Sequence, residues 1–179
     1  MIELRPATIP DAEALSVLAT TTFHDGWADI IGTAAAHEYT AHYLTPGRLT
    51  AEIADRDTHF YLLAFSDAAL LGYAKLDFAR PTHGSVTGER PVLLQRLYVA
   101  ASGRGTGVAD TLLTGIEEVA SRRGYETLWL ECDPRNVRAW RFYEKRGFVA
   151  RDKVAYILPG GQNDEVRVME RGVADALGW

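Results

Sequence analysis

The chain has 179 residues, which at about 100–200 residues per domain predicts a single domain over residues 1–179. Apolar residues make up 47% of the chain and charged residues 24%, a composition that excludes general disorder. The net charge of −5 argues against unaided binding to nucleic acid or to an anionic membrane surface, and the lone cysteine, Cys132, excludes an internal disulfide.

Targeting and metal-binding signals are absent from the sequence. The first residues do not follow the pattern of a signal peptide, and no apolar run approaches the ~20 residues of a membrane span. The five histidines are dispersed without the spacing of metal ligands. We therefore expect a cytoplasmic protein that needs no metal and binds neither membrane nor nucleic acid.

Hydrophobic periodicity divides the first half of the chain into a helical part and a strand part. Thr8 with Pro10 is typical of a helix start, as is Thr45 with Pro46. From Phe60 the apolar residues change to extended spacing. In chain order, the predicted elements are a strand over residues 2–5, helices from residue 11, over about 33–44 and from residue 46, and strands over 60–66 and 70–78.

The second half of the chain alternates strands and helices after a loop over residues 79–91. The predicted elements are a strand over 92–99, a helix from 108 to 123, a strand over 127–132, a helix ending near 146, and extended segments over 148–158 and 166–171 around a turn at 159–164. Strand–helix–strand alternation implies parallel pairing, and hairpins imply antiparallel pairing. The sequence therefore predicts an α/β fold with one mixed, twisted sheet of six to seven strands flanked by about four helices.

A glycine-rich turn between Val99 and Ala109 joins the end of a strand to the start of a helix. Free N–H groups at a helix start favour an anion, and Gly105 and Gly107 would let the backbone approach a phosphate. A merely flexible turn explains the glycines equally well. The turn is no P-loop, because Val108 stands where that motif needs lysine, and it does not fit the dinucleotide fingerprint.

Two motifs resemble those of one enzyme superfamily. The segment Arg104-Gly-Thr-Gly-Val-Ala109 resembles the acyl-CoA-binding motif of the GNAT superfamily of N-acetyltransferases. The segment Asn136-Val-Arg-Ala-Trp-Arg-Phe-Tyr-Glu-Lys-Arg-Gly-Phe148 is similar to that family's Asn-x-x-Ala-x-x-Phe-Tyr-x-x-x-Gly-Phe signature. The predicted elements also follow the family's order. The resemblance implies the acyl-CoA N-acyltransferase fold and transfer of an acetyl group from acetyl-CoA to an amine, by direct attack in a ternary complex without a metal.

Three short segments look like the bacterial polyamine (spermidine/spermine) acetyltransferase branch of the superfamily. They are Gly72-Tyr-Ala-Lys75, Arg96-Leu-Tyr-Val99 and Gln162-Asn-Asp164. Members of that branch tend to carry acidic residues where this chain has Leu93 and Gln95. The implied acceptor is a small amine or polyamine, with a protein amine second, and we expect polyamines to be accepted without selectivity. Relatives often dimerise, so a homodimer is among the expected partners.

The resemblance also implies which residues hold acetyl-CoA. Backbone groups near Leu97 and Val99 would pair with the pantetheine arm, and the Val99 N–H would stabilise the oxyanion that develops on the thioester. N–H groups from Arg104 to Ala109 would hold the pyrophosphate. Asn136 would bind ligand or cap its helix, or do both. The implied cofactor-binding set is Leu97, Tyr98, Val99, Arg104, Gly105, Thr106, Gly107, Val108, Ala109, Asn136, Ala139, Tyr143 and Lys145.

Tyr143 is the implied catalytic acid, which would protonate the leaving CoA thiolate. A thiol has a pKa of about 8.5 and tyrosine of about 10, so the transfer is mildly uphill but feasible when both groups are desolvated. The alternative role for Tyr143 is aromatic packing against Trp140.

A general base is needed because an amine with a pKa near 10.4 is almost entirely protonated at pH 7. Glu131, at the end of the central predicted strand, is the best-placed candidate. The alternatives are Asp133, Asp77, His83, His24 and Glu38.

The acceptor site is expected between residues 23–56 and 79–91, with Trp27, Tyr39 and Tyr43 shaping it. The rival function is a non-catalytic acyl-CoA-binding or regulatory module on the same fold. Tyr143 and Asn136 argue against that function, because a binding-only domain has no need of an acid for the leaving group.

Overall fold

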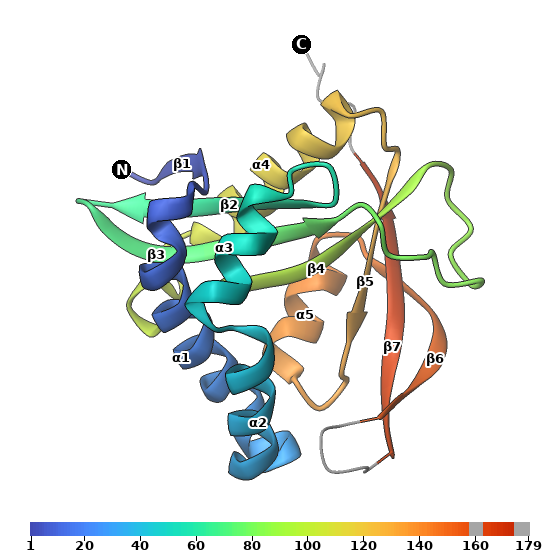
Figure 1. The fold of residues 1–179 in the computed structure, drawn as a ribbon. Helices are drawn as coiled ribbons and strands as arrows, with labels where there is room; N and C mark the ends of the chain where they lie inside the picture. Colours follow the sequence, from blue (N-terminus) through green and yellow to red (C-terminus); the bar gives the residue numbers. More distant parts are fainter. Residues whose placement is uncertain (158–162, 174–179) are drawn as a thin grey trace.

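A computed structural model describes residues 1–157 and 163–173. Seven strands in these ranges form one mixed sheet in the order β1-β2-β3-β4-β5-β7-β6 (Figure 1). The strands are β1 (Glu3–Pro6), β2 (His59–Ser66), β3 (Ala69–Asp77), β4 (Pro91–Val99), β5 (Thr127–Cys132), β6 (Val149–Ile157) and β7 (Asn163–Gly172). Neighbouring strands are antiparallel apart from β4 and β5, which are parallel. The predicted sheet is thereby confirmed.

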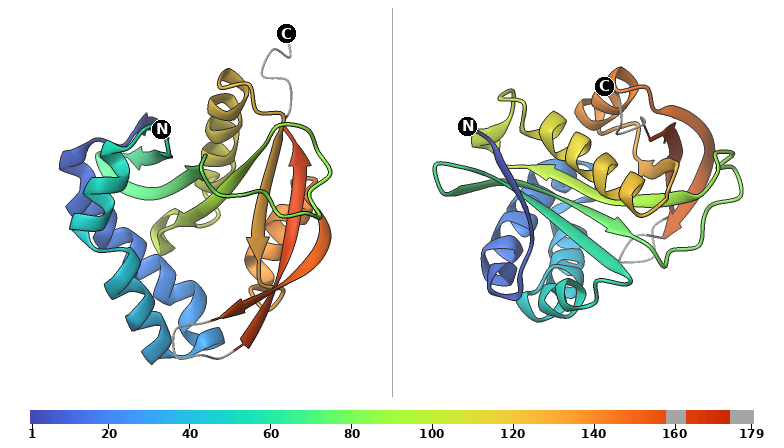
Figure 2. Two further views of the ribbon diagram at one scale, coloured as in Figure 1. Left: turned by 45° about the vertical axis from the view of Figure 1, so that its right-hand side comes forward. Right: turned by 90° about the horizontal axis from the view of Figure 1, so that it is seen from above.

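Five α-helices cover the two faces of this sheet within the described ranges. They are α1 (Ala12–Ile31), α2 (Thr33–Tyr43), α3 (Pro46–Ala54), α4 (Val108–Arg122) and α5 (Val137–Lys145). Helices α1 to α3 lie on one face, and α4 and α5 lie on the other (Figure 2). The helix predicted from residue 46 is confirmed as α3, which buries Leu49 and Ile53.

Each face of the sheet has its own core because side chains alternate along the strands. Leu112 and Ile116 of α4 pack against the strand residues Val92 and Leu128. On the other face, α1 and α3 pack against β2 and β3 around Leu63. None of the helices in the described ranges has the combined length and apolar character needed to cross a bilayer.

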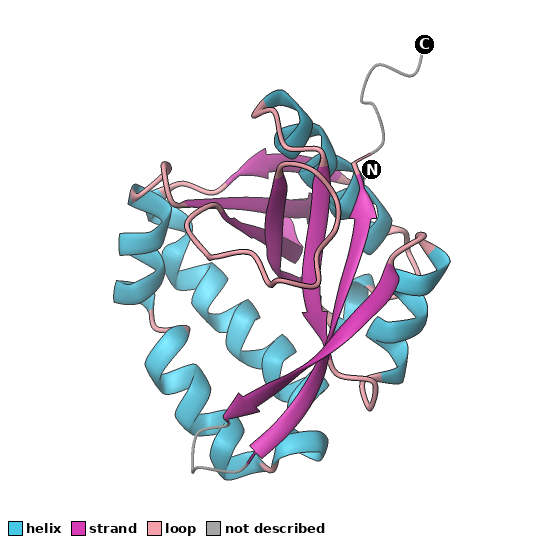
Figure 3. Cartoon of the chain, turned by 90° about the vertical axis from the view of Figure 1, so that its right-hand side faces the viewer, coloured by secondary structure: helices cyan, strands magenta, loops and turns pink. Residues whose placement is uncertain are grey.

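The C-terminal hairpin places its last strand inside the sheet. Strand β7 pairs with β5 along its length, and β6 pairs with the outer edge of β7 (Figure 3). The turn predicted at residues 159–164 lies mostly outside the described residues. Because β7 pairs with β5 along its whole length, the C-terminal end of β5 remains part of the sheet even where it no longer pairs with β4.

Glu52 is a buried carboxylate that ties α3 to the sheet. It accepts hydrogen bonds from the Tyr61 hydroxyl, from Lys75 Nζ at 2.6 Å and from Arg48 Nε at 3.1 Å. Burial alone would raise the pKa of Glu52, but the charge and hydrogen bond of Lys75, together with Tyr61 and Arg96, lower that pKa to about 2. The carboxylate is therefore ionised, and its partners stabilise the ionised form.

We expect Glu52→Gln to lower the free energy of unfolding at pH 7 by about 3 kcal/mol, the lower end for a broken buried ion pair. The variant keeps an amide for hydrogen bonding but leaves the Lys75 ammonium buried without its counter-charge. Denaturant unfolding measures the change. As a control, Glu118→Gln removes an exposed pair with Arg122 and should cost less than about 1 kcal/mol.

The Glu52–Lys75 pair also predicts how the stability of the fold depends on pH. A carboxylate with a pKa of about 2 in the folded protein and about 4.3 when unfolded stabilises the fold above pH 4.3. That contribution disappears as the pH falls through 4.3 toward 2. The stability difference between the parent protein and Glu52→Gln should therefore shrink between pH 5 and pH 2.5, and a constant difference would contradict the assignment.

Candidate active site

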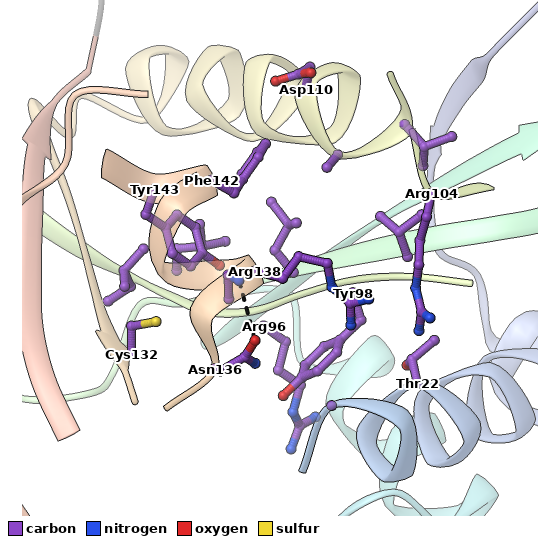
Figure 4. Close-up of a pocket in the computed structure, with 18 of the residues that line it drawn as sticks. Thr22, Arg96, Tyr98, Arg104, Asp110, Cys132, Asn136, Arg138, Phe142 and Tyr143 are labelled. Atoms are coloured by element: carbon purple, nitrogen blue, oxygen red, sulfur yellow. Dashed lines mark hydrogen bonds between the residues drawn. The ribbon is translucent and has the colours of Figure 1, made fainter. Parts of the chain in front are cut away.

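A cavity of about 360 Å³ lies where β4 and β5 diverge (Figure 4). The two strands pair over Pro91–Leu93 and Thr127–Trp129, and no further pairing between them occurs in the described structure. Beyond these residues the strands separate (Figure 2, left). The cavity is bounded by α1, the second half of β4, the turn before α4, the end of β5, and α5. Its volume is within the range of small-molecule sites.

The wall formed by β4 presents unpaired backbone groups to the cavity. Ala100 donates its N–H to the Leu71 carbonyl at 2.8 Å, which fixes the alternation of hydrogen bonds along β3 and β4. In that alternation the N–H and C=O groups of Leu97 and Val99 point away from β3, toward the side where β5 has separated. This wall can hydrogen-bond an extended ligand as a neighbouring strand would.

The turn between β4 and α4 presents a cluster of backbone donors. Gly105 and Gly107 adopt positive φ angles of 77° and 90°, which glycine accepts without strain. The N–H groups of Gly105, Gly107, Val108, Ala109 and Asp110 have no acceptor within the described part of the chain. An ideal Cβ at Gly107 would meet no atom within 4 Å, so the space beside this turn is open. The turn and the helix dipole together can hold an anion such as a pyrophosphate.

Arg104, in the same turn, is paired across the cavity mouth. Its guanidinium donates to the Asp25 carboxylate of α1 at 2.7 Å, and both side chains are partly exposed. Thr106, which belongs to the predicted cofactor-binding set, does not line the cavity. Its hydroxyl donates to the Gly103 carbonyl at 2.7 Å within the turn. A ligand that engages the Arg104 side chain would compete with Asp25.

Tyr143 projects from α5 into the cavity, and its hydroxyl points into the open space (Figure 4). The ring lies edge-on to Phe142 and Phe148, with centroid separations of 5.4 and 5.3 Å. Its hydroxyl makes no hydrogen bond among the described residues. Burial raises its pKa well above the usual range, with smaller contributions from Cys132 and Tyr98. The hydroxyl therefore stays protonated at neutral pH and can act as a proton donor.

Asn136 lies at the start of α5 and lines the cavity. Its side-chain oxygen accepts the Ala139 N–H at 3.2 Å, so the helix-capping role is observed. The amide nitrogen lies on the side of Gly26 of α1. One residue can thus cap the helix and offer an N–H donor to a ligand.

Glu131 lines the cavity from the end of β5, and its side chain is 24% exposed. The closest cation is Arg80, at 4.0 Å. Asp133, by contrast, is buried and held by Arg135. Asp77 accepts two backbone N–H groups outside the cavity. His83, His24 and Glu38 do not line the cavity either.

Cys132 follows Glu131 and faces the other side of β5. The thiol is buried, and burial raises its pKa to about 12. It is therefore a neutral thiol at physiological pH, in keeping with a packing role. No group of three or more His, Cys, Asp or Glu side chains in the described ranges is placed to hold a metal ion.

The structure brings most of the predicted site residues to one cavity. Besides Thr106, the exception is Lys145, an exposed residue at the end of α5 that does not line it. Of the expected acceptor wall, Trp27 lines the cavity and no residue of 79–91 does. Arg80 of that loop nevertheless lies 4.0 Å from Glu131, and Thr87 of the same loop binds Glu170.

Among the cavity residues that the sequence analysis gave no role are two arginines, Arg96 of β4 and Arg138 of α5. Arg96 could have been noticed, because it is a charged residue in the otherwise apolar strand segment Val-Leu-Leu-Gln-Arg-Leu-Tyr-Val, and a buried charge needs a partner. Arg138 carries no comparable signal, because exposed arginines are common on helices.

The site combines a turn with free backbone donors at one end, a free strand edge along the middle and a protonated tyrosine hydroxyl at the other. A family profile for the acetyltransferase (GNAT) family matches residues 20–148. The chain belongs to this family, which confirms the predicted fold and the predicted class of enzyme.

Comparisons with individual proteins agree. The chain is 30% identical over 165 residues to an uncharacterized N-acetyltransferase of Mycobacterium tuberculosis, covering 89% of this chain and 97% of that protein. The PaiA N-acetyltransferase of Thermoplasma acidophilum, solved with coenzyme A, has a TM-score of 0.76 at 22% identity over 96% of this chain and 99% of its own. YncA of Salmonella typhimurium, solved with acetyl-CoA, has a TM-score of 0.74 at 16% identity, over 97% of this chain and 95% of its own. These two structures share the fold.

Proposed function

We propose that the protein transfers an acetyl group from acetyl-CoA to a small amine in the cavity between β4 and β5. The observation that carries this proposal is the pair of unpaired backbone surfaces, the Leu97–Val99 edge and the Gly105–Asp110 turn. They suit the two hydrogen-bonding parts of the CoA molecule, the pantetheine amides and the pyrophosphate. The family's solved relatives with CoA or acetyl-CoA support the same ligand.

We assign one residue to each step of the transfer. The Val99 N–H faces the opening and stabilises negative charge on the thioester oxygen. Glu131 accepts the proton that the ammonium form of the acceptor must lose, directly or through water. Tyr143 donates its proton to the sulfur that leaves. The unpaired hydroxyl of Tyr143, which points into the cavity, supports this role because no competing hydrogen bond holds its proton.

The acceptor in this proposal is a small amine of low charge. Polyamines, the substrates of the branch that three sequence segments resemble, require carboxylates to bind their several charges. Two carboxylates line the cavity in the described structure, Glu131 and Asp110, and Asp110 is paired with Arg146. Leu93 is a buried apolar residue, and Gln95 carries no charge. We therefore propose that polyamines are acetylated without selectivity.

An acetyl-CoA thiol-release assay over a panel of amines, polyamines and peptides tests the proposal. We expect acceptor-dependent release of CoA thiol with at least one small monoamine, and lower kcat/KM for spermidine than for that amine. Binding of acetyl-CoA without release for any acceptor would instead support the non-catalytic module. A kcat/KM for spermidine above that of every monoamine and peptide would overturn the acceptor assignment.

The Asp25–Arg104 pair leads to a separate prediction on CoA affinity. We propose that Arg104 must leave Asp25 to reach the pyrophosphate. Asp25→Asn should then tighten CoA binding by about 2- to 5-fold, the range expected for an exposed ion pair. Calorimetric titration with CoA measures the change. In the Arg104→Gln variant, adding Asp25→Asn should not change the affinity for CoA. An equal tightening of CoA binding in that variant would contradict the proposed role of Arg104.

A further inference from the structure

Arg96 is a buried cation on the α1 side of the cavity, next to Tyr98 (Figure 4). It is 7% exposed. Its guanidinium donates to the Tyr61 hydroxyl at 3.1 Å, and Tyr39 is a second tyrosine neighbour. The closest carboxylate is Glu52, at 3.8 Å. That carboxylate already accepts hydrogen bonds from three other donors.

Buried charges in proteins are normally paired at hydrogen-bonding distance, because removal from water is costly. Lys75 follows this rule, because it is paired with Glu52. Arg96, in contrast, has mainly the neutral hydroxyl groups of tyrosines as its neighbours. Asp77, the other buried carboxylate nearby, accepts the backbone N–H groups of Ala79 and Arg80 and acts on Lys75. A guanidinium has five N–H donors in a planar fork, so most of the hydrogen-bonding capacity of Arg96 is unused by carboxylates.

Two unpaired polar atoms are close to Arg96 in the chain or in space. The Gln95 side-chain oxygen is buried without a hydrogen-bond partner, and Gln95 lines the cavity. The Tyr73 hydroxyl is also buried without a partner and interacts electrostatically with Arg96. Unsatisfied buried groups are rare in folded proteins and often indicate a missing ligand or water.

We propose that Arg96 binds a carboxylate on the acceptor, so that the acceptor is a small amine that also carries a carboxylate. The proposal rests on the proposed function and specifies the substrate class of the same site. A planar guanidinium suits a carboxylate through two parallel hydrogen bonds. A polyamine offers no such group and would bring additional positive charge next to Arg96. The site therefore selects an amino acid over a polyamine.

The position of Arg96 on β4 limits the size of the acceptor. Arg96 and Val99 are three residues apart, roughly 10 Å along a strand at about 3.3 Å per residue. The amine must reach the region of Val99 and Tyr143 while the carboxylate remains at Arg96. A series of amino acids of increasing chain length should therefore show an optimum.

The test compares amino acids with the amines that lack only the carboxylate. The probes are L-phenylalanine with phenethylamine, and 4-aminobutyrate with propylamine. The ratio of kcat/KM within each pair is measured in the parent protein and in Arg96→Gln. Because intrinsic amine reactivity is the same for both proteins, it cancels when the two ratios are compared. We expect the ratio to fall by about 10- to 100-fold in the variant for at least one pair.

Arg138→Gln is the matched control, because it removes a cavity-lining arginine that is exposed on α5. Its ratio should change by less than about 3-fold. An equal fall in both variants would indicate a general charge effect and overturn the proposal. Arg96→Lys, which keeps the charge without the fork, should recover part of the ratio. An unchanged ratio in a folded Arg96→Gln protein would also overturn it.

Folding of each variant is checked by the rise in melting temperature with acetyl-CoA. If Arg96→Gln does not fold, the proposal can still be tested with the parent protein alone. In that protein 3-phenylpropionate, which lacks the amine, should inhibit acetylation of L-phenylalanine competitively and more strongly than phenethylamine does. The opposite order would overturn the proposal.

Failure of the proposed function would give a different result. Calorimetric titration of 4-aminobutyrate and propylamine into the protein–CoA complex measures acceptor binding without turnover. Preferential binding of the acid without thiol release would support the Arg96 site and refute the acetyltransferase role. Thiol release without a preference for the acid in either measurement would support the acetyltransferase role and refute the Arg96 site.

Discussion

Tyr143→Phe is expected to lower kcat by about 10²- to 10⁴-fold, the usual contribution of a general acid, with little change in affinity for acetyl-CoA. The substitution deletes the hydroxyl group and keeps the ring between Phe142 and Phe148. Without the hydroxyl, water or another group must protonate the leaving thiolate. Steady-state kinetics on the best acceptor measure kcat, and calorimetry measures CoA affinity.

The control for this prediction is the same change outside the cavity. Tyr125 stacks on Phe78, with ring centroids 5.6 Å apart, and Tyr125→Phe should keep the parental kcat. Because burial raises the pKa of Tyr143, the hydroxyl remains protonated up to and beyond pH 10. The acid should therefore not be lost in the mildly alkaline range. Full turnover in Tyr143→Phe would show that the hydroxyl is not the acid.

Local signals in the sequence were sufficient to predict most of the helices and strands. Thr45 and Pro46 begin α3, and Gly107 with φ of 90° ends the turn before α4. These features depend on the residue's own backbone preferences and close neighbours. The predicted strand over residues 127–132 matches β5 for the same reason, since a short apolar run needs no distant information to be recognised.

Long-range pairing was harder to predict. The insertion of β7 between β5 and β6 depends on contacts between residues far apart in the chain. So does the end of pairing between β4 and β5 after Leu93, which opens the cavity. The family resemblance implied that Leu97 and Val99 face a ligand, but no local pattern in the sequence indicates where β4 and β5 separate. The position of the loop over residues 79–91 depends on such long-range contacts too, because Thr87 binds Glu170 and Arg80 lies 4.0 Å from Glu131.

Individual site residues were predictable to different degrees. Asn136 and Tyr143 belong to a signature with fixed spacing on one helix, so their common location follows from the helix itself. Lys145 belongs to the same signature but ends α5 on the exposed side. Arg96 was missed because the meaning of a charged residue in a strand depends on what packs against it. Here the neighbours come from α2, α3, β2 and β3.

Gly107→Val is expected to weaken CoA binding by about 10²- to 10⁴-fold, equivalent to the loss of about two hydrogen bonds to a charged group. Gly107 has a φ of 90°, and a β-branched residue is strained there. Relief of that strain would turn the N–H groups of the loop away from their common target. The new side chain would also occupy the open space beside the turn, where no atom lies within 4 Å of an ideal Cβ.

The same substitution at Gly124 is a matched control for backbone strain. Gly124 has a φ of 82°, also has open space around its Cβ position, and lies after the C-terminal end of α4. Both variants should lose about 1–2 kcal/mol of stability from the left-handed backbone. Only Gly107→Val should lose the stabilisation by CoA, which for the parent protein is about 2.7 kcal/mol at a CoA concentration 100-fold above Kd. Equal CoA affinity in the two variants would show that the turn before α4 does not hold the phosphates.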